Sequence, residues 1–231
     1  MKRFYKRAEP LEGESGHGVA LDRRPVKTPG KRELVVPKRV LAAAIAEEWN
    51  AQEEEIRPAT MPLTRLATTA IDRVATQREA IIEETANYAG TDLVCYRAAQ
   101  PPALAVRQQT VWQPLVDWAA LRYDAPLVIT TGVIPKSQSV ASLHAFAAAV
   151  AEQDDFALTG LHVATAASGS LVIGLALIEG QLDAQEAFAT SQLDESFQIE
   201  AWGEDSEQAE RRRALAADIA AAARFILLLR G

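Results

Sequence analysis

Carboxylates crowd one short stretch near the end of the chain. Within residues 194–205 they are Asp194, Glu195, Glu200, Glu204 and Asp205. Carboxylates held together can transfer protons, bind a divalent cation or accept hydrogen bonds from the cations of a protein partner. Asp194, Glu195 and Glu200 are the candidates for a carboxylate-based hydrolase or metal enzyme. Because no histidine or tight metal-binding loop accompanies them, a solvated acidic face is favoured over a metal site.

A helix stop lies inside this acidic stretch. A helical pattern of apolar residues runs up to Trp202, and Gly203 follows it immediately. Glycine just after a periodic segment ends helices, and acids in the next first turn favour a new helix start. The sequence therefore predicts a helix–helix corner that collects an aromatic side chain and several carboxylates. Such a corner either contacts a partner or serves only as a capping elbow with its acids in water.

Recognisable catalytic and cofactor motifs are missing from the chain. It has no glycine-rich phosphate loop, dinucleotide fingerprint or nucleophile elbow, and His17, His144 and His162 share no ligand motif. His162 lies in an apolar helical pattern and is predicted to be a hydrogen-bonded core residue. The lone Cys95 lies in an apolar run, which favours burial, and a single cysteine excludes an internal disulfide. No set of residues in the sequence meets the requirements for a nucleophile, a base and a group that orients the base.

Opposite charges separate along the chain. Residues 1–40 contain 11 Lys and Arg and 5 Asp and Glu, whereas residues 41–231 contain 13 and 26, so the net charges are +6 and −13. An acidic body repels phosphate backbones, and the basic arm lacks interleaved aromatic residues beyond Phe4 and Tyr5. Nucleic-acid binding is thus not expected, and a basic protein surface suits the body better. The charged start of the chain shows no secretory signal.

Strand-like segments occupy the first 36 residues, and helical periodicity dominates after Pro62. The predicted strands are Val19–Leu21, Pro25–Thr28 and Glu33–Val36. A tight turn is predicted at Asp22–Arg24, and Pro37 opens a helix. Residues 57–62 break that helix and mark a domain boundary. These patterns predict an α+β fold with a β-rich domain at 1–58 and a helical domain at 59–231.

The helical part contains one segment long enough to cross a bilayer. Residues 156–178 contain no Asp, Glu, Lys or Arg, but they include His162, and acidic residues flank them. A single helix buried on all sides is therefore predicted, with no membrane insertion. Its Ser168–Ser170 segment is expected to let neighbouring helices approach closely. Further predicted elements are helices at Ser139–Gln153 and at about Ser206–Leu229, and a short extended piece at Val128–Val133.

Several blocks of sequence together resemble one protein family. They are Leu21–Pro29, Ala46–Gln52, Pro58–Ala67, Ala70–Val74, Tyr88, Thr91–Arg97, Trp112–Leu115, Leu193–Glu195, Phe197–Gln198 and Glu200–Asp205. In this combination and order the chain resembles the ATP synthase assembly chaperones that hold the free alpha subunit of the catalytic head, known in mitochondria as assembly factor two. The match covers nearly the whole chain. It departs from the family at Arg23, where the glycine of a type I′ turn is usual.

The resemblance implies a small β-rich N-terminal domain, a larger orthogonal helical bundle, and a chaperone without catalysis or cofactor. Its partner would be the unassembled alpha subunit of the F-type ATP synthase. The residues implied in partner binding are Glu200 and Asp205 first, then Trp202, Glu204, Asp194 and Glu195. Gly203 would be the structural corner, with Trp202 as a packing anchor. Because family-like sequence starts at once, we expect a bacterial, cytoplasmic member, whereas eukaryotic members lie in the mitochondrial matrix.

Overall fold

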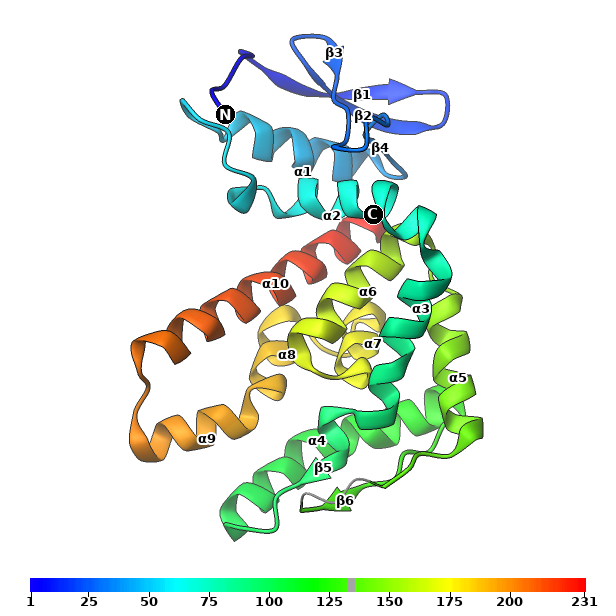
Figure 1. The fold of residues 1–231 in the computed structure, drawn as a ribbon, viewed down its shortest axis with the longest axis vertical. Coiled ribbons are helices and arrows are strands. Elements are labelled where there is room, and N and C mark those ends of the chain that lie inside the picture. Colours follow the sequence, from blue (N-terminus) through cyan, green and yellow to red (C-terminus); the bar gives the residue numbers. More distant parts are fainter. Residues whose placement is uncertain (133–135) are drawn as a thin grey trace. The chain divides into compact units, whose positions relative to one another are not determined.

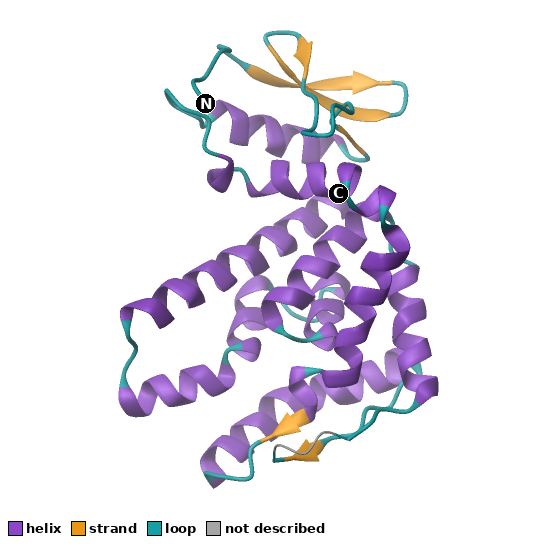
Figure 2. Ribbon diagram, in the orientation of Figure 1, coloured by secondary structure: helices purple, strands orange, loops and turns teal. Residues whose placement is uncertain are grey.

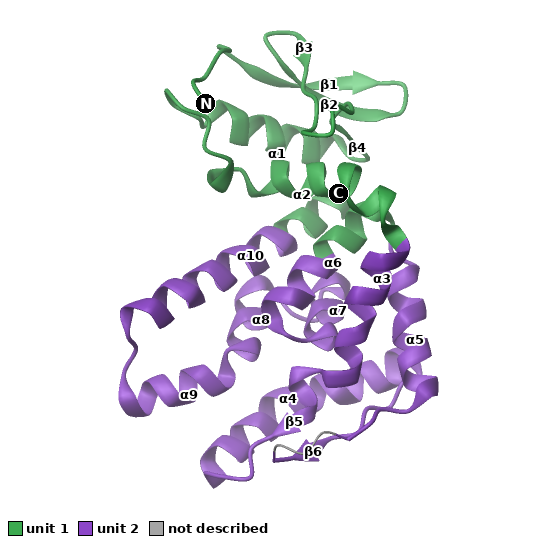
Figure 3. Cartoon of the chain, in the orientation of Figure 1, with its two compact units in different colours: residues 1–78, 154–160, 224–231 green, residues 79–153, 161–223 purple. Residues whose placement is uncertain are grey.

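Two compact units make up the protein, and each combines segments that are distant in sequence (Figure 3). The computed structural model describes residues 1–132 and 136–231. Unit 1 comprises residues 1–78, 154–160 and 224–231, and unit 2 comprises residues 79–153 and 161–223. A small sheet in unit 1 and abundant helix elsewhere confirm the predicted α+β class (Figure 2). The predicted division into domains 1–58 and 59–231 stays a prediction.

The sheet of unit 1 is built on strand β2 (Gly16–Leu21) (Figure 1). Strand β1 (Ala8–Gly13) pairs with it antiparallel, and the short strands β3 (Arg24–Pro25) and β4 (Val35–Val36) also pair with β2. Strand β1 escaped the sequence analysis because four of its six residues are exposed, so it lacks the apolar alternation of a half-buried strand. The strand conformation of β1 is stabilised by its hydrogen bonds to β2, and the sequence of β1 alone does not indicate it.

The turn between β2 and β3 confirms the tight turn predicted there. Asp22 and Arg23 form a two-residue loop with φ values of 47° and 69°. Positive φ at both positions is what a type I′ turn requires, so Arg23 takes the conformation that glycine usually supplies. The Asp22 carboxylate accepts hydrogen bonds from the backbone N–H groups of Lys6 and Arg7, both at 3.0 Å. These bonds hold the turn despite the missing glycine.

Helix α1 (Arg39–Asn50) packs against β1 and β2 and begins two residues after Pro37, as predicted. Its last turn also positions the next helices, η1 (Pro58–Thr60), α2 (Pro62–Asp72) and η2 (Val74–Thr76). The buried carboxylate of Glu48 accepts hydrogen bonds from the backbone N–H groups of Leu63 at 2.7 Å and Thr64 at 2.8 Å. Because the first turn of a helix has no internal partners for these donors, Glu48 caps α2 from a distance in sequence.

Unit 2 is mainly helical. The remaining elements are α3 (Arg78–Ala86), η3 (Asn87–Thr91), η4 (Leu93–Cys95), β5 (Tyr96–Arg97), α4 (Pro102–Tyr123), β6 (Thr130–Thr131), α5 (Val140–Ala151), α6 (Asp155–Ser168), α7 (Leu171–Glu179), α8 (Ala184–Ser191), α9 (Leu193–Trp202) and α10 (Ser206–Arg230). The starts of α3 and α6 and the end of α10 belong to unit 1. Helices α5 and α10 confirm two predicted helices. Strand β6, parallel to β5, lies within the predicted extended piece, whose Val133 lies outside the described residues.

The charge-free segment 156–178 is divided between two helices, so the single helix predicted for it is wrong. Helix α6 ends at Ser168, and Gly169 takes a left-handed φ of 70°. The Ser170 hydroxyl then accepts a hydrogen bond from the N–H of Ile173 at 3.0 Å, which caps α7. Helix α7 is nevertheless buried along its whole apolar run, and this run forms much of the core of unit 2.

Helices α6 and α7 approach closely, but not at Ser168–Ser170 as predicted. A Cβ added at Gly174 would lie 2.4 Å from the hydroxyl oxygen of Thr165, whereas one added at Gly169 would meet no atom within 4 Å. Gly174 is therefore the residue that permits the close approach. Among the described residues, no helix combines the length and hydropathy needed to span a membrane.

Hydrogen bonds to the side chain of Asp92 connect the start of α7 to the segment before β5. Its fully buried carboxylate accepts hydrogen bonds from the Ser170 hydroxyl at 2.5 Å and from the N–H groups of Val172 at 3.0 Å and Val94 at 3.2 Å. Burial raises the pKa of Asp92 to about 6, although these donors act in the opposite direction. Cys95 is buried nearby, as predicted, and burial raises the pKa of its thiol to about 12.

Candidate functional site

The predicted corner between α9 and α10 is present. Helix α9 ends at Trp202, and α10 begins at Ser206. Gly203, between them, has φ 83° and ψ 171°, a backbone conformation essentially restricted to glycine. The corner is therefore set by the backbone freedom of one residue, as the sequence predicts.

Glu200 forms a two-pronged ion pair with Arg107 of α4. Each carboxylate oxygen of Glu200 lies 2.7 Å from a guanidinium nitrogen, the geometry that the planar guanidinium favours. The guanidinium also lies over the ring of Phe197, 5.2 Å from its centroid. The hydrogen bonds from Arg107 lower the pKa of Glu200, so its carboxylate is ionised near neutrality. Side-chain exposure of 56% for Glu200 leaves lone pairs of the carboxylate open to a partner's cation.

Trp202 lies in solvent, so the prediction that it is a packing anchor is wrong. Its side chain is 81% exposed. Trp202 is the last residue of α9, and the backbone changes direction at Gly203, so neither helix covers the indole. A large aromatic side chain left in water is a typical feature of protein contact surfaces.

Glu204 and Asp205 contact their own unit. Glu204 lies 3.2 Å from the guanidinium of Arg212, which also donates to the Ser196 hydroxyl at 3.2 Å. The Asp205 carboxylate accepts a hydrogen bond from the N–H of Gln208 at 2.8 Å and thereby caps α10. Part of the predicted binding set thus also stabilises the corner.

Asp194 and Glu195 lie at the other end of α9, in its first turn. The half-buried carboxylate of Asp194 accepts a hydrogen bond from the side-chain amide of Gln108 at 2.8 Å. Burial raises the pKa of Asp194, with the hydrogen bond from Gln108 acting against it. Glu195 is exposed. These acids therefore differ from Glu200 in both surroundings and partners.

The acids of α9, all of them described in the structure, do not form a metal-binding cluster. In the part of the chain that the structure describes, no group of three or more His, Cys, Asp or Glu side chains is arranged to hold a metal ion. His162 is hydrogen-bonded through its Nδ1 to the Thr85 hydroxyl at 2.9 Å, as predicted for a core histidine. The carboxylates at the two ends of α9 have separate partners, which are Gln108 for Asp194 and Arg107 for Glu200.

An apolar groove of about 660 Å³ lies between α4 and helices α8 and α9. Its apolar lining includes Val111, Pro114, Leu115, Trp118, Leu182 and Leu193. Arg107 also lines it, so the groove extends to the Glu200 ion pair. Neither the role of Arg107 nor the groove follows from the sequence alone. Arg107 carries no local signal, because 93 residues separate it from Glu200. Proline inside a helical pattern, at Pro114, was the available hint of the groove.

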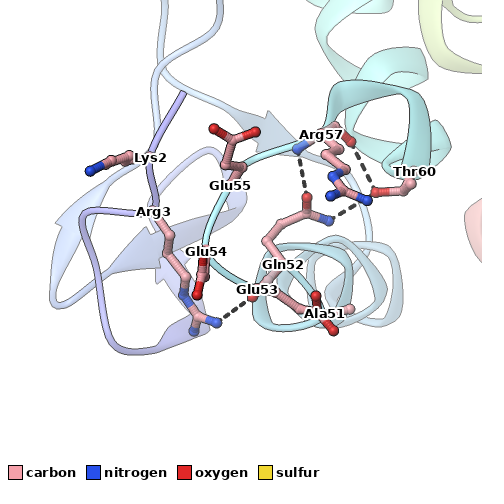
Figure 4. A pocket seen from close by; sticks show the side chains of 9 residues that line it. All are labelled: Lys2, Arg3, Ala51, Gln52, Glu53, Glu54, Glu55, Arg57 and Thr60. Carbon is pink, nitrogen blue, oxygen red and sulfur yellow. Dashed lines mark hydrogen bonds between the residues drawn. The ribbon is translucent and has the colours of Figure 1, made fainter.

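A second, polar pocket lies in unit 1 beside the loop that follows α1 (Figure 4). It has a volume of about 790 Å³. Arg3 donates to the carbonyl of Gln52, whose side chain accepts from the N–H of Arg57 at 2.7 Å and donates to the Thr60 hydroxyl at 3.1 Å. These bonds tie the start of the chain to the loop, so the polar groups here serve the fold of unit 1.

Comparison with known proteins extends over the whole chain. A family model described as ATP12 chaperone protein matches residues 2–120. Two solved structures of the ATP12 protein of Paracoccus denitrificans, one of them a point mutant, have TM-scores of 0.95 and identities of 46% and 45%. Each match covers 99% of this chain and 98% of the other. The mitochondrial ATP12 protein of Schizosaccharomyces pombe is 22% identical over an alignment of 214 residues, and the match covers 87% of this chain and 74% of that protein.

Proposed function

Because the chain belongs to the ATP12 chaperone protein family, we propose that it is an assembly chaperone of the F-type ATP synthase. It binds the unassembled alpha subunit of the catalytic head and prevents its aggregation until that subunit pairs with beta. The observation that carries this proposal is the match to ATP12 structures along nearly the entire chain. We further propose that the protein acts in the bacterial cytoplasm and catalyses no reaction.

The physical need for such a protein follows from subunit assembly. A subunit that will be buried against its neighbours exposes a large apolar face while it is alone, and such faces cause aggregation. A chaperone has only to cover this face and be displaced by the proper neighbour. It needs no nucleotide hydrolysis and no catalytic group. The acids of α9 and of the corner after it are consistent with this role, since Glu200 forms an ion pair, Asp194 accepts a hydrogen bond and Asp205 caps α10.

We assign the contact with the alpha subunit to the α9–α10 corner. Trp202 offers an exposed indole, the side chain most enriched among residues that dominate binding energy. Glu200 offers an ionised carboxylate held in one orientation by Arg107. Glu204, Asp205, Asp194 and Glu195 add negative charge around them, which suits cations of a basic partner surface. Gly203 sets the backbone that presents the indole and the carboxylate together.

Co-expression tests the function directly. The alpha subunit of the matching ATP synthase is produced with and without this protein, and its soluble fraction is measured. With the chaperone, the alpha subunit should stay soluble and co-purify with it. A strain that lacks the chaperone should assemble less catalytic head. Failure to bind the alpha subunit, together with normal assembly in that strain, would overturn the proposal.

A single substitution tests the assigned corner. Glu200→Gln removes the charge and keeps the side-chain shape. Because the Arg107 pair is exposed, the melting temperature should stay close to that of the wild type, while protection of the alpha subunit is lost. Glu210→Gln is the matched control, since Glu210 is also exposed on this part of the chain and lies outside the assigned set. If Glu200→Gln protects the alpha subunit as well as the control does, the site assignment is wrong.

A further inference from the structure

The apolar groove of unit 2 has the dimensions of a helix-binding surface. Its α4 wall runs from Arg107 to Trp118, which corresponds to about 16 Å of helix, or roughly three turns. Val111 and Pro114 are exposed on this wall, and Ala189 is exposed on the opposite wall in α8. Apolar side chains therefore line an open groove that no element of unit 2 covers in the described part of the chain. A partner helix of about three turns would match its length.

Pro114 leaves a backbone carbonyl of α4, that of Thr110, without its usual helical hydrogen bond. Proline inside a helix usually costs about 3 kcal/mol, and Pro114 is exposed, so an ordinary helix-forming residue would fit the position. Proline has no N–H, so it cannot donate to the carbonyl of Thr110 one turn earlier. That carbonyl therefore lies beside the proline ring without its usual helical partner. Thr110 is exposed and directly precedes Val111, which lines the groove, so a donor of a bound partner can reach this carbonyl.

The segment that supplies the opposite wall of the groove is rich in carboxylates, and one of them, Glu186, lines the groove itself. Residues 179–205, which include α8 and α9, contain eight carboxylates and no Lys, Arg or His. Three of these carboxylates pair with arginines from α4 and α10. Eight negative charges minus three neutralised ones leave a net charge of −5 on this segment of the chain. Such a potential favours a partner segment with Lys or Arg and disfavours an acidic one.

We propose that this groove binds an amphipathic helix of the client protein. The helix lays its apolar face on Val111, Pro114 and Leu182, and it carries Lys or Arg along the edge that faces α8 and α9. A donor of the same helix bonds the carbonyl of Thr110. This inference rests on the proposed function, because it names the client segment that the chaperone holds. A second groove, between α3 and α5, is smaller at about 420 Å³ and does not reach the Glu200 corner.

A charge-insertion pair tests the groove. Ala189→Arg places a long cation inside it, whereas Gln185→Arg makes the same charge gain on an exposed residue of α8 outside the lining. Wild type and variant, differently tagged, are co-expressed with the alpha subunit, and their ratio in the purified complex is measured. Ala189→Arg should lower its share roughly tenfold or more, with an unchanged melting temperature. Gln185→Arg should compete equally with the wild type.

Pro114→Ala provides a test in which stability and binding move in opposite directions. Alanine restores an N–H that can donate to the Thr110 carbonyl, so the melting temperature should rise. The same hydrogen bond removes the acceptor from the groove, so the share of this variant in the complex should fall several-fold. A variant that is more stable yet binds less cannot be explained by unfolding. Unchanged binding of both Pro114→Ala and Ala189→Arg overturns the groove proposal while the chaperone function stands.

Photo-crosslinking identifies the occupant of the groove. A benzoylphenylalanine in place of Val111 should crosslink to a client segment with apolar residues three and four apart and with Lys or Arg. The same photoreactive residue in place of Ile82, in the smaller groove, should give no client crosslink. Crosslinks from position 111 to an acidic segment or to a second copy of this chain would overturn the inference. If wild type fails to bind the alpha subunit at all, the proposed function fails first, and the inference with it.

Discussion

Two carboxylates from the family-like sequence blocks, Asp92 and Glu200, meet opposite environments. Asp92 is fully buried, and its partners are a hydroxyl and two backbone N–H groups of its own unit. Glu200 is exposed, and its partner is the exposed side chain of Arg107. Burial raises the pKa of Asp92, while hydrogen bonds from Arg107 lower that of Glu200. The same carboxylate group therefore stabilises the fold from a buried position at Asp92 and is exposed to solvent at Glu200.

The difference shows that a sequence block can serve the fold without touching a partner. Glu48 caps α2, and Asp72 accepts from the Thr28 hydroxyl and the N–H of Gly30, both at 2.8 Å. Both acids lie in blocks that resemble the family, as Glu200 does. Resemblance alone cannot separate the two roles, because selection for stability and for binding both preserve acids. Exposure and partner type separate them.

Removal of the buried carboxylate is the largest expected effect. Asp92→Ala leaves the Ser170 hydroxyl and two N–H groups without their acceptor in a buried site. The free energy of unfolding should fall by about 3–5 kcal/mol, as measured by urea denaturation. Asp92→Asn keeps one acceptor oxygen and should lose less. If Asp92→Ala lowered the free energy of unfolding by less than about 1 kcal/mol, the buried carboxylate would matter no more for stability than the exposed Glu200 is expected to.

The pH dependence of stability sharpens the same contrast. The pKa of Asp92 is about 6 in the folded protein and 3.8 as a model value, so the folded state binds the proton more tightly. The contribution of Asp92 to the free energy of unfolding is therefore greatest below about pH 4 and falls as pH rises to about 6, by about 3 kcal/mol. Asp92→Asn abolishes this titration. The stability of wild type minus that of Asp92→Asn should decrease between pH 4 and 6, and a constant difference would contradict the burial argument.

The corner itself should depend on the backbone of Gly203. A Cβ at this position meets no atom within 4 Å, so only backbone strain opposes Gly203→Ala. At φ 83° and ψ 171° this strain should cost about 1–3 kcal/mol, measured by thermal and urea unfolding. Gly90→Ala is the control, because its Cβ also meets no atom and its φ lies outside the positive range. If the two variants were equally stable, the corner would not depend on the φ and ψ angles that glycine permits at position 203.

Trp202→Ala should have the smallest effect on stability and a large one on binding. An 81% exposed side chain contributes little to the fold, so the free energy of unfolding should change by less than about 0.5 kcal/mol. Loss of a binding hot spot should weaken the complex with the alpha subunit roughly 30-fold. Leu121→Ala, with a side chain that is 87% exposed, is the control and should change neither quantity. Destabilisation by Trp202→Ala would restore the packing-anchor interpretation, and unchanged binding would remove Trp202 from the contact surface.

The successes and failures of the sequence analysis have distinct physical causes. The stop at Gly203, the start of α10 and the turn at Asp22–Arg23 were predicted, because each depends on a few neighbouring residues. The break at Gly169 was missed, because hydropathy continues unchanged across it and only the backbone and the Ser170 cap interrupt the helix. Exposure of Trp202 was missed because aromatic residues at the end of a periodic pattern are usually covered.

The sequence by itself determined the fold class, the bounds of α5 and α10 and the resemblance to the family, since these depend on local signals and on the order of blocks along the chain. It also supplied the acidic body and the carboxylates of α9. Only the tertiary structure decided which acids are buried, that Glu200 is held by Arg107, and that Pro114 faces an open groove. These properties arise between side chains that are 78 to 93 residues apart, as in the Asp92–Ser170 and Arg107–Glu200 pairs. Their positions depend on how helices pack, and no local pattern in the chain encodes that packing.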